Sequence, residues 1–190
     1  MRYDWKRLYS ELSDCRKCGL CEARHNIVIG DGNPHAKLMF IGEGPGRDED
    51  LQGIPFVGAA GQLLDKMLRA IDIERQDVYI ANVVKCRPPN NRVPTYEEAS
   101  MCLPYLRAQY ALVRPEIVVC LGATAARNII DKDIYITRDR GRWIEKNSVW
   151  FMATYHPAAL LRDESKKRDA WEDLKSIKRR YDSIAKQQNT

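Results

Sequence analysis

The stretch that decides the fold covers residues 37–50 and reads KLMFIGEGPGRDED. Its first part, Lys37 to Gly42, is a short apolar run of the kind that forms a buried strand. The Gly-Glu-Gly-Pro-Gly turn that follows lets the backbone and a ligand approach each other closely. In open α/β sheets, ligands bind just beyond the carboxyl ends of the strands. We therefore predict that Glu43 lies at a binding site, although a solvated Glu in a sharp turn is the simpler interpretation of this motif alone.

Three more apolar runs are predicted strands, at 78–84, 117–121 and 149–154. Helical periodicity or helix-capping residues lie between and around them, and the stretch 31–34 is predicted to be a loop. Strands that alternate with helices form parallel sheets covered on both faces. We therefore predict an α/β fold with one domain over residues 1–190, an α/β/α sandwich around a four-stranded parallel sheet. The predicted helices cover 5–12, 63–71, the segment after Thr95, the segment after Gly122, and 170–184.

The other predicted strands also end in residues suited to binding, namely Asn82, Gly122 and His156. Because the carboxyl ends of parallel strands share one edge of a sheet, these residues and Glu43 are expected to converge. Seen singly, Asn82 is most simply a strand-end amide and His156 a loop residue. Phe56, in the loop Pro-Phe-Val-Gly, is most simply a core residue. Their joint placement favours a binding site.

The composition of this 190-residue chain is that of a soluble globular domain, with 44% hydrophobic and 30% charged residues. No apolar run is long enough to span a membrane, and the first residues lack the apolar segment of a signal peptide, so we expect a cytoplasmic protein. The formal net charge of +5 favours polyanionic partners. The 26 acidic residues are interspersed with the basic ones, so charge alone does not establish nucleic-acid binding.

Six cysteines in a chain without a secretory signal indicate metal ligands or core thiols rather than disulfides. Cys120 lies inside a predicted strand and is expected in the core. The others form two pairs, Cys15-x2-Cys18 and Cys86-x15-Cys102, with Cys21 as a competitor for a ligand role. Four thiolates suit either Zn²⁺ or an iron–sulfur cluster, and the spacing does not decide between them.

A basic, proline-containing loop over residues 85–94 follows the second predicted strand. Arg87 and Arg92 can bind nucleic-acid phosphates there, with Asn91 between them. The N-terminus of the helix after Gly122 offers a further phosphate contact. This loop is therefore the predicted DNA-binding segment.

Taken together, these motifs resemble those of the family 4 uracil-DNA glycosylases, the iron–sulfur branch of the uracil-DNA glycosylase superfamily. The resemblance covers nearly the whole chain, in the order Cys15-x2-Cys18, 42–46 (GEGPG), 55–58 (PFVG), 81–89 (ANVVKCRPP), 122–126 (GATAA) and His156-Pro157. Each motif alone is weak, whereas their order and spacing are specific. The resemblance implies base excision repair activity and a structural [4Fe-4S] cluster held by Cys15, Cys18, Cys86 and Cys102.

The resemblance also implies roles for the residues at the strand ends. Phe56 would stack on uracil, Asn82 would read its Watson–Crick edge, and His156 would face O2. Better-known branches of the superfamily use an Asp in this motif to handle the attacking water, and the comparable position here is Gly44, beside Glu43. The carboxylate of Glu43 could orient the water or support the positively charged sugar.

The implied partner is uracil-containing DNA, single- or double-stranded, and Leu160, four residues after His156, would wedge into its base stack. We expect a monomeric and monofunctional hydrolase, because none of the residues expected to face the base is a lysine that could form a Schiff base. The chain has no histidine between residues 36 and 155, so the covalent product trapping of a related branch is not expected. No membrane partner is expected, and a replication-clamp partner is not identified. The alternative function is an iron–sulfur or zinc nucleic-acid-binding protein without glycosylase activity.

Overall fold

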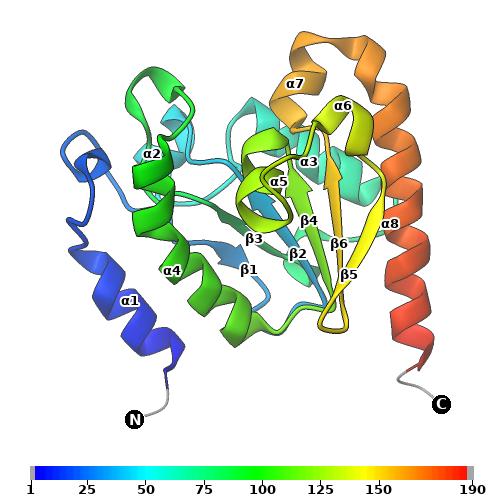
Figure 1. Ribbon diagram of the computed structural model, residues 1–190, viewed down its shortest axis with the longest axis horizontal. Coiled ribbons are helices and arrows are strands. Elements are labelled where there is room, and N and C mark those ends of the chain that lie inside the picture. The colour runs from blue at the N-terminus through cyan, green and yellow to red at the C-terminus, as the bar shows by residue number, and fades with distance from the viewer. Residues whose placement is uncertain (1–2, 188–190) are drawn as a thin grey trace.

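The computed structural model describes residues 3–187, and in this range the strands form one six-stranded sheet with the order β1-β3-β2-β4-β6-β5. Helices cover both faces of the sheet (Figure 1). The strand bounds are β1 Asp31–Gly32, β2 Leu38–Gly42, β3 Tyr79–Asn82, β4 Ile117–Leu121, β5 Trp143–Lys146 and β6 Val149–Thr154. The predicted α/β class with helices on both faces is confirmed.

The prediction of a purely parallel, four-stranded sheet is wrong. The four predicted strands are present as β2, β3, β4 and β6, and they pair in parallel. Two short strands extend this parallel centre, and both run antiparallel to their neighbours: β1 along β3, and β5 along β6. The stretch 31–34, predicted as a loop, contributes β1 through Asp31 and Gly32.

Both added strands lack the apolar runs by which the central strands are recognised. β1 has two residues, too few for any periodicity, and it pairs with the free edge of β3. β5 is mostly exposed, and it joins β6 through Asn147 and Ser148, whose φ angles are +51° and +62°. Two successive left-handed residues are typical of the tight turns that match the twist of a hairpin.

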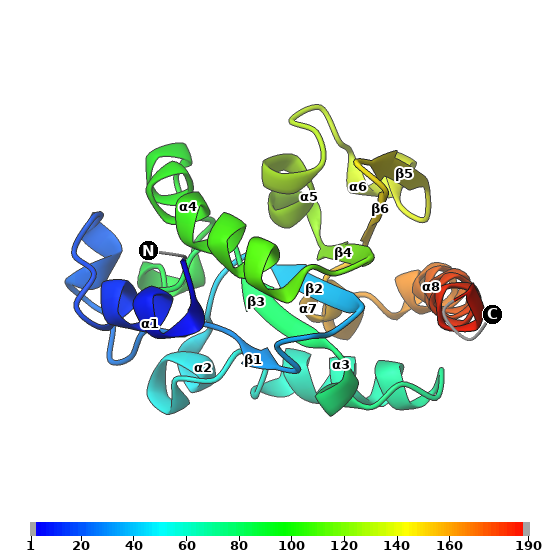
Figure 2. The ribbon, with the colours of Figure 1, turned by 90° about the horizontal axis from the view of Figure 1, so that it is seen from below.

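The helices are arranged in two layers around the sheet, as Figure 2 shows from below. Helices α4 and α5 pack on one face, whereas α3, α7 and α8 pack on the other. Helix α1 lies outside α4, against Tyr105. The bounds are α1 Trp5–Ser13, α2 Arg47–Gln52, α3 Ala59–Arg69, α4 Tyr96–Val113, α5 Ala123–Ile129, α6 Ile136–Asp139, α7 Pro157–Arg162 and α8 Lys167–Gln187, with 3-10 turns η1 Gly19–Cys21, η2 Arg75–Asp77, η3 Pro89–Asn91 and η4 Glu164–Lys166.

Each central strand is buried on both faces and divides its side chains between two cores. In β2, Met39 and Ile41 pack under α4 and α5, whereas Leu38 and Phe40 pack under α3 and α8. This alternation follows from the two-residue period of a strand. It explains why the central strands read as continuous apolar runs. Cys120 in β4 is fully buried, as predicted. Across the described residues, no helix combines the length and apolar character needed to cross a bilayer.

Candidate active site and cysteine site

A cleft of about 840 Å³ lies at the carboxyl ends of the parallel strands. The four residues expected to converge there, Glu43, Asn82, Gly122 and His156, all line it, one from each central strand end. The chain continues from β2 to β3 on one side of β2, and later places β4 on its other side. The cleft therefore lies where the strand order reverses, the usual ligand position in such sheets.

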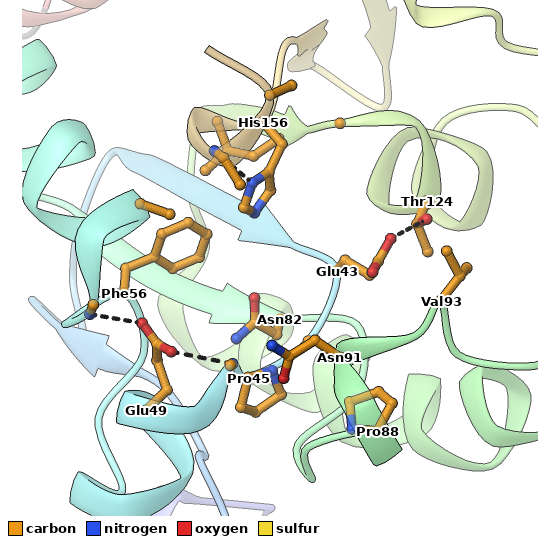
Figure 3. A pocket seen from close by; sticks show the side chains of 18 of the residues that line it. Glu43, Pro45, Glu49, Phe56, Asn82, Pro88, Asn91, Val93, Thr124 and His156 are labelled. Atoms are coloured by element: carbon orange, nitrogen blue, oxygen red, sulfur yellow. Dashed lines mark hydrogen bonds between the residues drawn. The ribbon is translucent and has the colours of Figure 1, made fainter. Parts of the chain in front are cut away.

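Asn82 forms part of the cleft wall and is 1% exposed. Its Oδ1 is buried and accepts no hydrogen bond from any residue that the structure describes. A buried carbonyl oxygen without a donor is costly, so this atom calls for a ligand that donates an N–H or O–H group. Figure 3 shows the amide between Phe56, His156 and Asn91.

Two glycines make room for this arrangement. A Cβ at Gly42 would lie 2.4 Å from Oδ1 of Asn82 and 2.7 Å from Cζ of Phe56, so both side chains rest on a bare backbone. Gly44, which lines the cleft, would place a Cβ 2.7 Å from Cγ2 of Val84. The glycines of the decisive stretch therefore serve close packing.

Phe56 forms one side of the cleft and is 5% exposed. Its ring centroid lies 5.5 Å from that of His156, with an angle of 33° between the ring planes. The backbone of Phe56 is left-handed, with φ of +53°, which is uncommon for a bulky residue. The ring thus faces the cleft from a strained loop between α2 and α3.

His156 caps helix α7 with its own ring: Nδ1 accepts a hydrogen bond of 3.1 Å from the backbone N–H of Ala158. Nδ1 is therefore the unprotonated nitrogen, which assigns the proton of the neutral ring to Nε2. Burial, assisted by the positive charge of Arg162, lowers the pKa of His156 from 6.5 to about 4. At neutral pH the side chain is an uncharged N–H donor.

Glu43 is held by a residue to which the sequence assigned no role. The hydroxyl of Thr124, in the first turn of α5, donates a hydrogen bond to Oε2 of Glu43. This leaves the other carboxylate oxygen for a ligand. Thr124 belongs to the Gly-Ala-Thr motif, but its spacing gave no reason to pair it with Glu43, 81 residues earlier.

A second acid, Glu49, was also missed. Its Oε1 accepts hydrogen bonds from the backbone N–H groups of Val57 (3.0 Å) and Gly58 (2.9 Å). Its Oε2 accepts one of 3.1 Å from Gly46. Glu49 therefore joins the loop that contains Gly46 to the loop that contains Gly58, as Figure 3 shows. In the sequence it resembles an ordinary acidic residue in the first turn of a helix.

The predicted DNA-binding loop borders the cleft in part. Asn91 and Arg92 line the cleft, but Arg92 forms a bidentate ion pair with Glu98, at 2.7 and 2.8 Å, which already neutralises its charge. Arg87 donates a hydrogen bond of 2.8 Å to Oδ1 of Asn91. Three arginines not predicted for this role also line the cleft: Arg47, Arg127 and Arg162. All three are exposed and available to phosphates.

Leu160, the predicted DNA wedge, does not project from the surface in the structure. Leu160 is 2% exposed and packs in the core with residues of α3 and α8. A buried core side chain cannot enter a base stack while α7 keeps its place. The next residue, Leu161, is 48% exposed. Helix α7 begins at Pro157, and the rotation of the helix turns position 160 inward.

The cysteines predicted as metal ligands gather around one small cavity, which Cys15, Cys18, Cys86 and Cys102 line together with Cys21. Three donors point at their sulfurs: the Arg24 guanidinium to Cys86 (3.3 Å), the Lys85 backbone N–H to Cys102 (3.3 Å) and the Tyr105 hydroxyl to Cys15 (3.5 Å). An all-sulfur ligand set with N–H donors and nearby positive charge fits an anionic iron–sulfur cluster.

Within residues 3–187, no group of three or more cysteine, histidine or acidic side chains forms a ready-made metal-ion site. Burial raises the pKa of Cys86 and raises that of Cys102 to about 11. These thiols must therefore lose their protons when they coordinate a metal or a cluster.

Comparison with known proteins connects the cleft to one family. The family model described as the uracil DNA glycosylase superfamily matches residues 29–175. The chain is 48% identical to the type-4 uracil-DNA glycosylase of Archaeoglobus fulgidus, over 88% of each chain. It is 46% identical to that of Thermotoga maritima, over 86% of this chain and 88% of the relative. A type-5 uracil-DNA glycosylase of Pyrobaculum aerophilum is 34% identical over 68% of this chain and 64% of its own. The chain therefore belongs to the uracil DNA glycosylase superfamily, among the type-4 enzymes.

Proposed function

We propose that this protein is a monofunctional uracil-DNA glycosylase, which hydrolyses the bond between uracil N1 and deoxyribose C1′ in DNA. The observation that carries the proposal is the unpaired, buried Oδ1 of Asn82. The N3–H of uracil is a donor that satisfies this oxygen, and the amide N–H of Asn82 then donates to uracil O4. Cytosine has an acceptor at N3 and a donor at N4, so both contacts fail and buried groups stay unpaired.

The other walls of the cleft suit a flat base taken out of the duplex. The Phe56 ring offers a stacking surface, and the absence of a side chain at Gly42 lets this ring pack directly on the backbone of β2. His156 approaches as a neutral N–H donor. When the glycosidic bond breaks, negative charge develops on uracil O2, and a donor already aimed at that atom stabilises the transition state.

Glu43 completes the proposed chemistry on the sugar side. Bond breaking builds positive charge on deoxyribose, which a fixed carboxylate stabilises through space. Thr124 fixes one oxygen of Glu43, so the other is available to orient the attacking water. Neither role requires a covalent enzyme intermediate.

A strand-cleaving reaction through a Schiff base would need an accessible lysine amine. The nearest lysine in sequence to Asn82 is Lys85, which is 1% exposed. Its ammonium donates hydrogen bonds to the backbone oxygen of Asn82 (2.7 Å) and to Gln109 (2.5 Å). This amine supports β3 from within the core, which favours the monofunctional assignment.

We further propose that Arg47, Arg127 and Arg162 contact phosphates around the extruded nucleotide, alongside Arg87 and Asn91. Arginine is suited to this because its planar group binds phosphate in a bidentate manner. The exposed Leu161 replaces Leu160 as the candidate wedge.

Cys15, Cys18, Cys86 and Cys102 would hold a [4Fe-4S] cluster, which we propose to be structural. The cluster would crosslink the segment after α1 to the loop after β3 and to α4. Zinc is the alternative, and visible absorption together with iron and sulfide content distinguishes the two. A colourless protein with stoichiometric zinc contradicts the cluster.

The activity is tested with oligonucleotides that carry uracil, cytosine or thymine at one position. We expect excision of uracil by the wild-type protein and a loss of most of it in Asn82→Ala, with DNA binding retained through phosphate contacts. Wild-type excision rates in Asn82→Ala would show that this amide does not read the base.

A further inference from the structure

The loop that carries Phe56 is fixed at its carbonyl groups by an arginine from a distant segment. Arg75, in η2, reaches across from the far end of α3. One guanidinium nitrogen donates to the backbone oxygen of Pro55 (2.6 Å) and the other to that of Phe56 (3.1 Å). The same guanidinium is held by Asp65 (3.0 Å) and Asp31 (3.3 Å). Its direction is therefore set by α3 and β1.

These contacts enclose a backbone that Phe56 does not favour by itself. A bulky residue with φ of +53° is strained and persists where the surroundings over-determine it. Glu49 accepts hydrogen bonds from the N–H groups of the two residues after Phe56. Arg75 donates hydrogen bonds to the carbonyl oxygens of Pro55 and Phe56, one on each side of the Phe56 Cα. Charge-assisted hydrogen bonds of this kind are the strong ones.

The left-handed backbone in turn decides where the ring stands. The ring packs on Gly42 and lies beside His156, at the position of the proposed base. A relaxed backbone at residue 56 would swing the ring away from this position. The backbone also lies directly on α3, where a Cβ at Gly61 would be 1.8 Å from the Phe56 oxygen. The loop is therefore packed between β2 and α3, and the hydrogen bonds of Arg75 hold it there.

We propose that Arg75 is a positioning residue for the reaction: by holding the Pro55 and Phe56 carbonyls, it keeps Phe56 left-handed so that the ring supports the base. This inference rests on the proposed glycosylase function. Arg75 does not itself line the cleft, and it acts through its hydrogen bond to Phe56, which does.

The test is a double-mutant cycle between Arg75→Met and Phe56→Gly, with Arg69→Met, an exposed arginine on α3, as the matched control. Single-turnover excision at saturating protein and DNA affinity are measured separately. In the Phe56 chain, Arg75→Met should lower the excision rate by about 10- to 100-fold with DNA affinity unchanged. Glycine adopts the left-handed backbone without strain and carries no ring. In the Phe56→Gly chain, Arg75→Met should therefore change the rate by about twofold or less.

An equal loss of rate in both backgrounds would assign Arg75 to general support of the fold and overturn the inference. A crystal structure of Arg75→Met gives a readout that does not depend on activity. We expect a negative φ at Phe56 and a displaced ring, and an unchanged left-handed Phe56 would also overturn the inference. If the wild-type protein excises no uracil, the proposed function fails, whereas the crystal structure still tests the role of Arg75.

Discussion

At the scale of single residues, the most informative side chain is His156. Its ring nitrogens have separate tasks, since Nδ1 accepts the Ala158 N–H and Nε2 is left to donate into the cleft. A donor that meets a developing negative charge contributes in the transition state more than in ground-state binding. His156→Ala should therefore lower the single-turnover excision rate by about 100- to 1000-fold, equivalent to about 2.7–4 kcal/mol, with little change in DNA affinity.

The matched control is His35→Ala, because His35 is an exposed histidine outside the cleft lining. Its excision rate should equal that of the wild-type protein. A His156→Ala rate within a few-fold of wild type would restrict this histidine to capping α7 and would leave the chemistry to Glu43 and Asn82.

The protonation of His156 gives a separate prediction about pH. Its pKa is lowered by burial to about 4, so the unfolded chain takes up this proton near pH 6.5 and the folded chain does so near pH 4. Between these values the unfolded state binds more protons, and the free energy of unfolding contributed by this group falls as the pH falls. Above pH 6.5 both states are neutral at this residue and its contribution is constant.

We expect the NMR signal that disappears in His156→Ala to titrate with a midpoint near pH 4. A midpoint near 6.5 would mean that water reaches the ring freely. In the excision assay, the same argument predicts no inflection from this residue near pH 6.5.

At the scale of elements, α7 shows which features of a short helix the sequence predicts and which it does not. The position of His156 was predictable from the end of an apolar strand, whereas α7, which begins at Pro157, was not among the predicted helices. The inward rotation of Leu160 was not predictable either, because the six-residue helix is too short to show an apolar face. Its packing against α3 is decided by the tertiary structure.

The two leucines of α7 should respond differently to truncation. Leu160→Ala should lower the free energy of unfolding by about 2–5 kcal/mol, since it leaves a cavity in the core. Leu161→Ala should change it by about 0.5 kcal/mol or less. Leu161→Ala should instead slow excision from duplex DNA more than from single-stranded DNA, because a single strand needs no wedge. Denaturant titration and paired duplex and single-strand assays measure these effects, and the opposite assignment of the two variants would restore Leu160 as the wedge.

The strands show the same division between predictable and unpredictable elements. The central strands were predictable because burial on both faces requires continuous apolar runs. The edge strands β1 and β5 were not, since their residues are mostly exposed and their pairing is decided by the free edges of β3 and β6.

At the scale of the whole molecule, the convergence of strand ends was predictable from parallel topology. The contacts that fix the site were not. Thr124 binds Glu43 and Arg75 binds Phe56 across 81 and 19 residues of sequence, and Glu49 joins two neighbouring loops. Each of these residues looks ordinary within its own segment. Sequence patterns identify the side chains that face a ligand, whereas the side chains that hold them in place are recognised only in the folded structure.

The cysteine site joins three separate segments of the chain and provides the last prediction. Cys15 and Cys18 follow α1, Cys86 follows β3, and Cys102 lies in α4, so a shared cluster would tie α1 and its following segment to the sheet. None of these cysteines lines the active-site cleft. Losing one ligand should therefore act first on stability, and on activity through it. In Cys86→Ala we expect the free energy of unfolding to fall by about 4 kcal/mol or more, and hence the Tm to fall by about 8–16 °C.

Cys21→Ala is the matched control, since Cys21 lines the same cavity outside the proposed ligand set, and it should keep the colour, the Tm and the activity of the wild-type protein. Thermal unfolding, iron content and excision rate are measured on the same samples. A Cys86→Ala protein that is colourless, equally stable and fully active would show that the cluster does not hold the fold together.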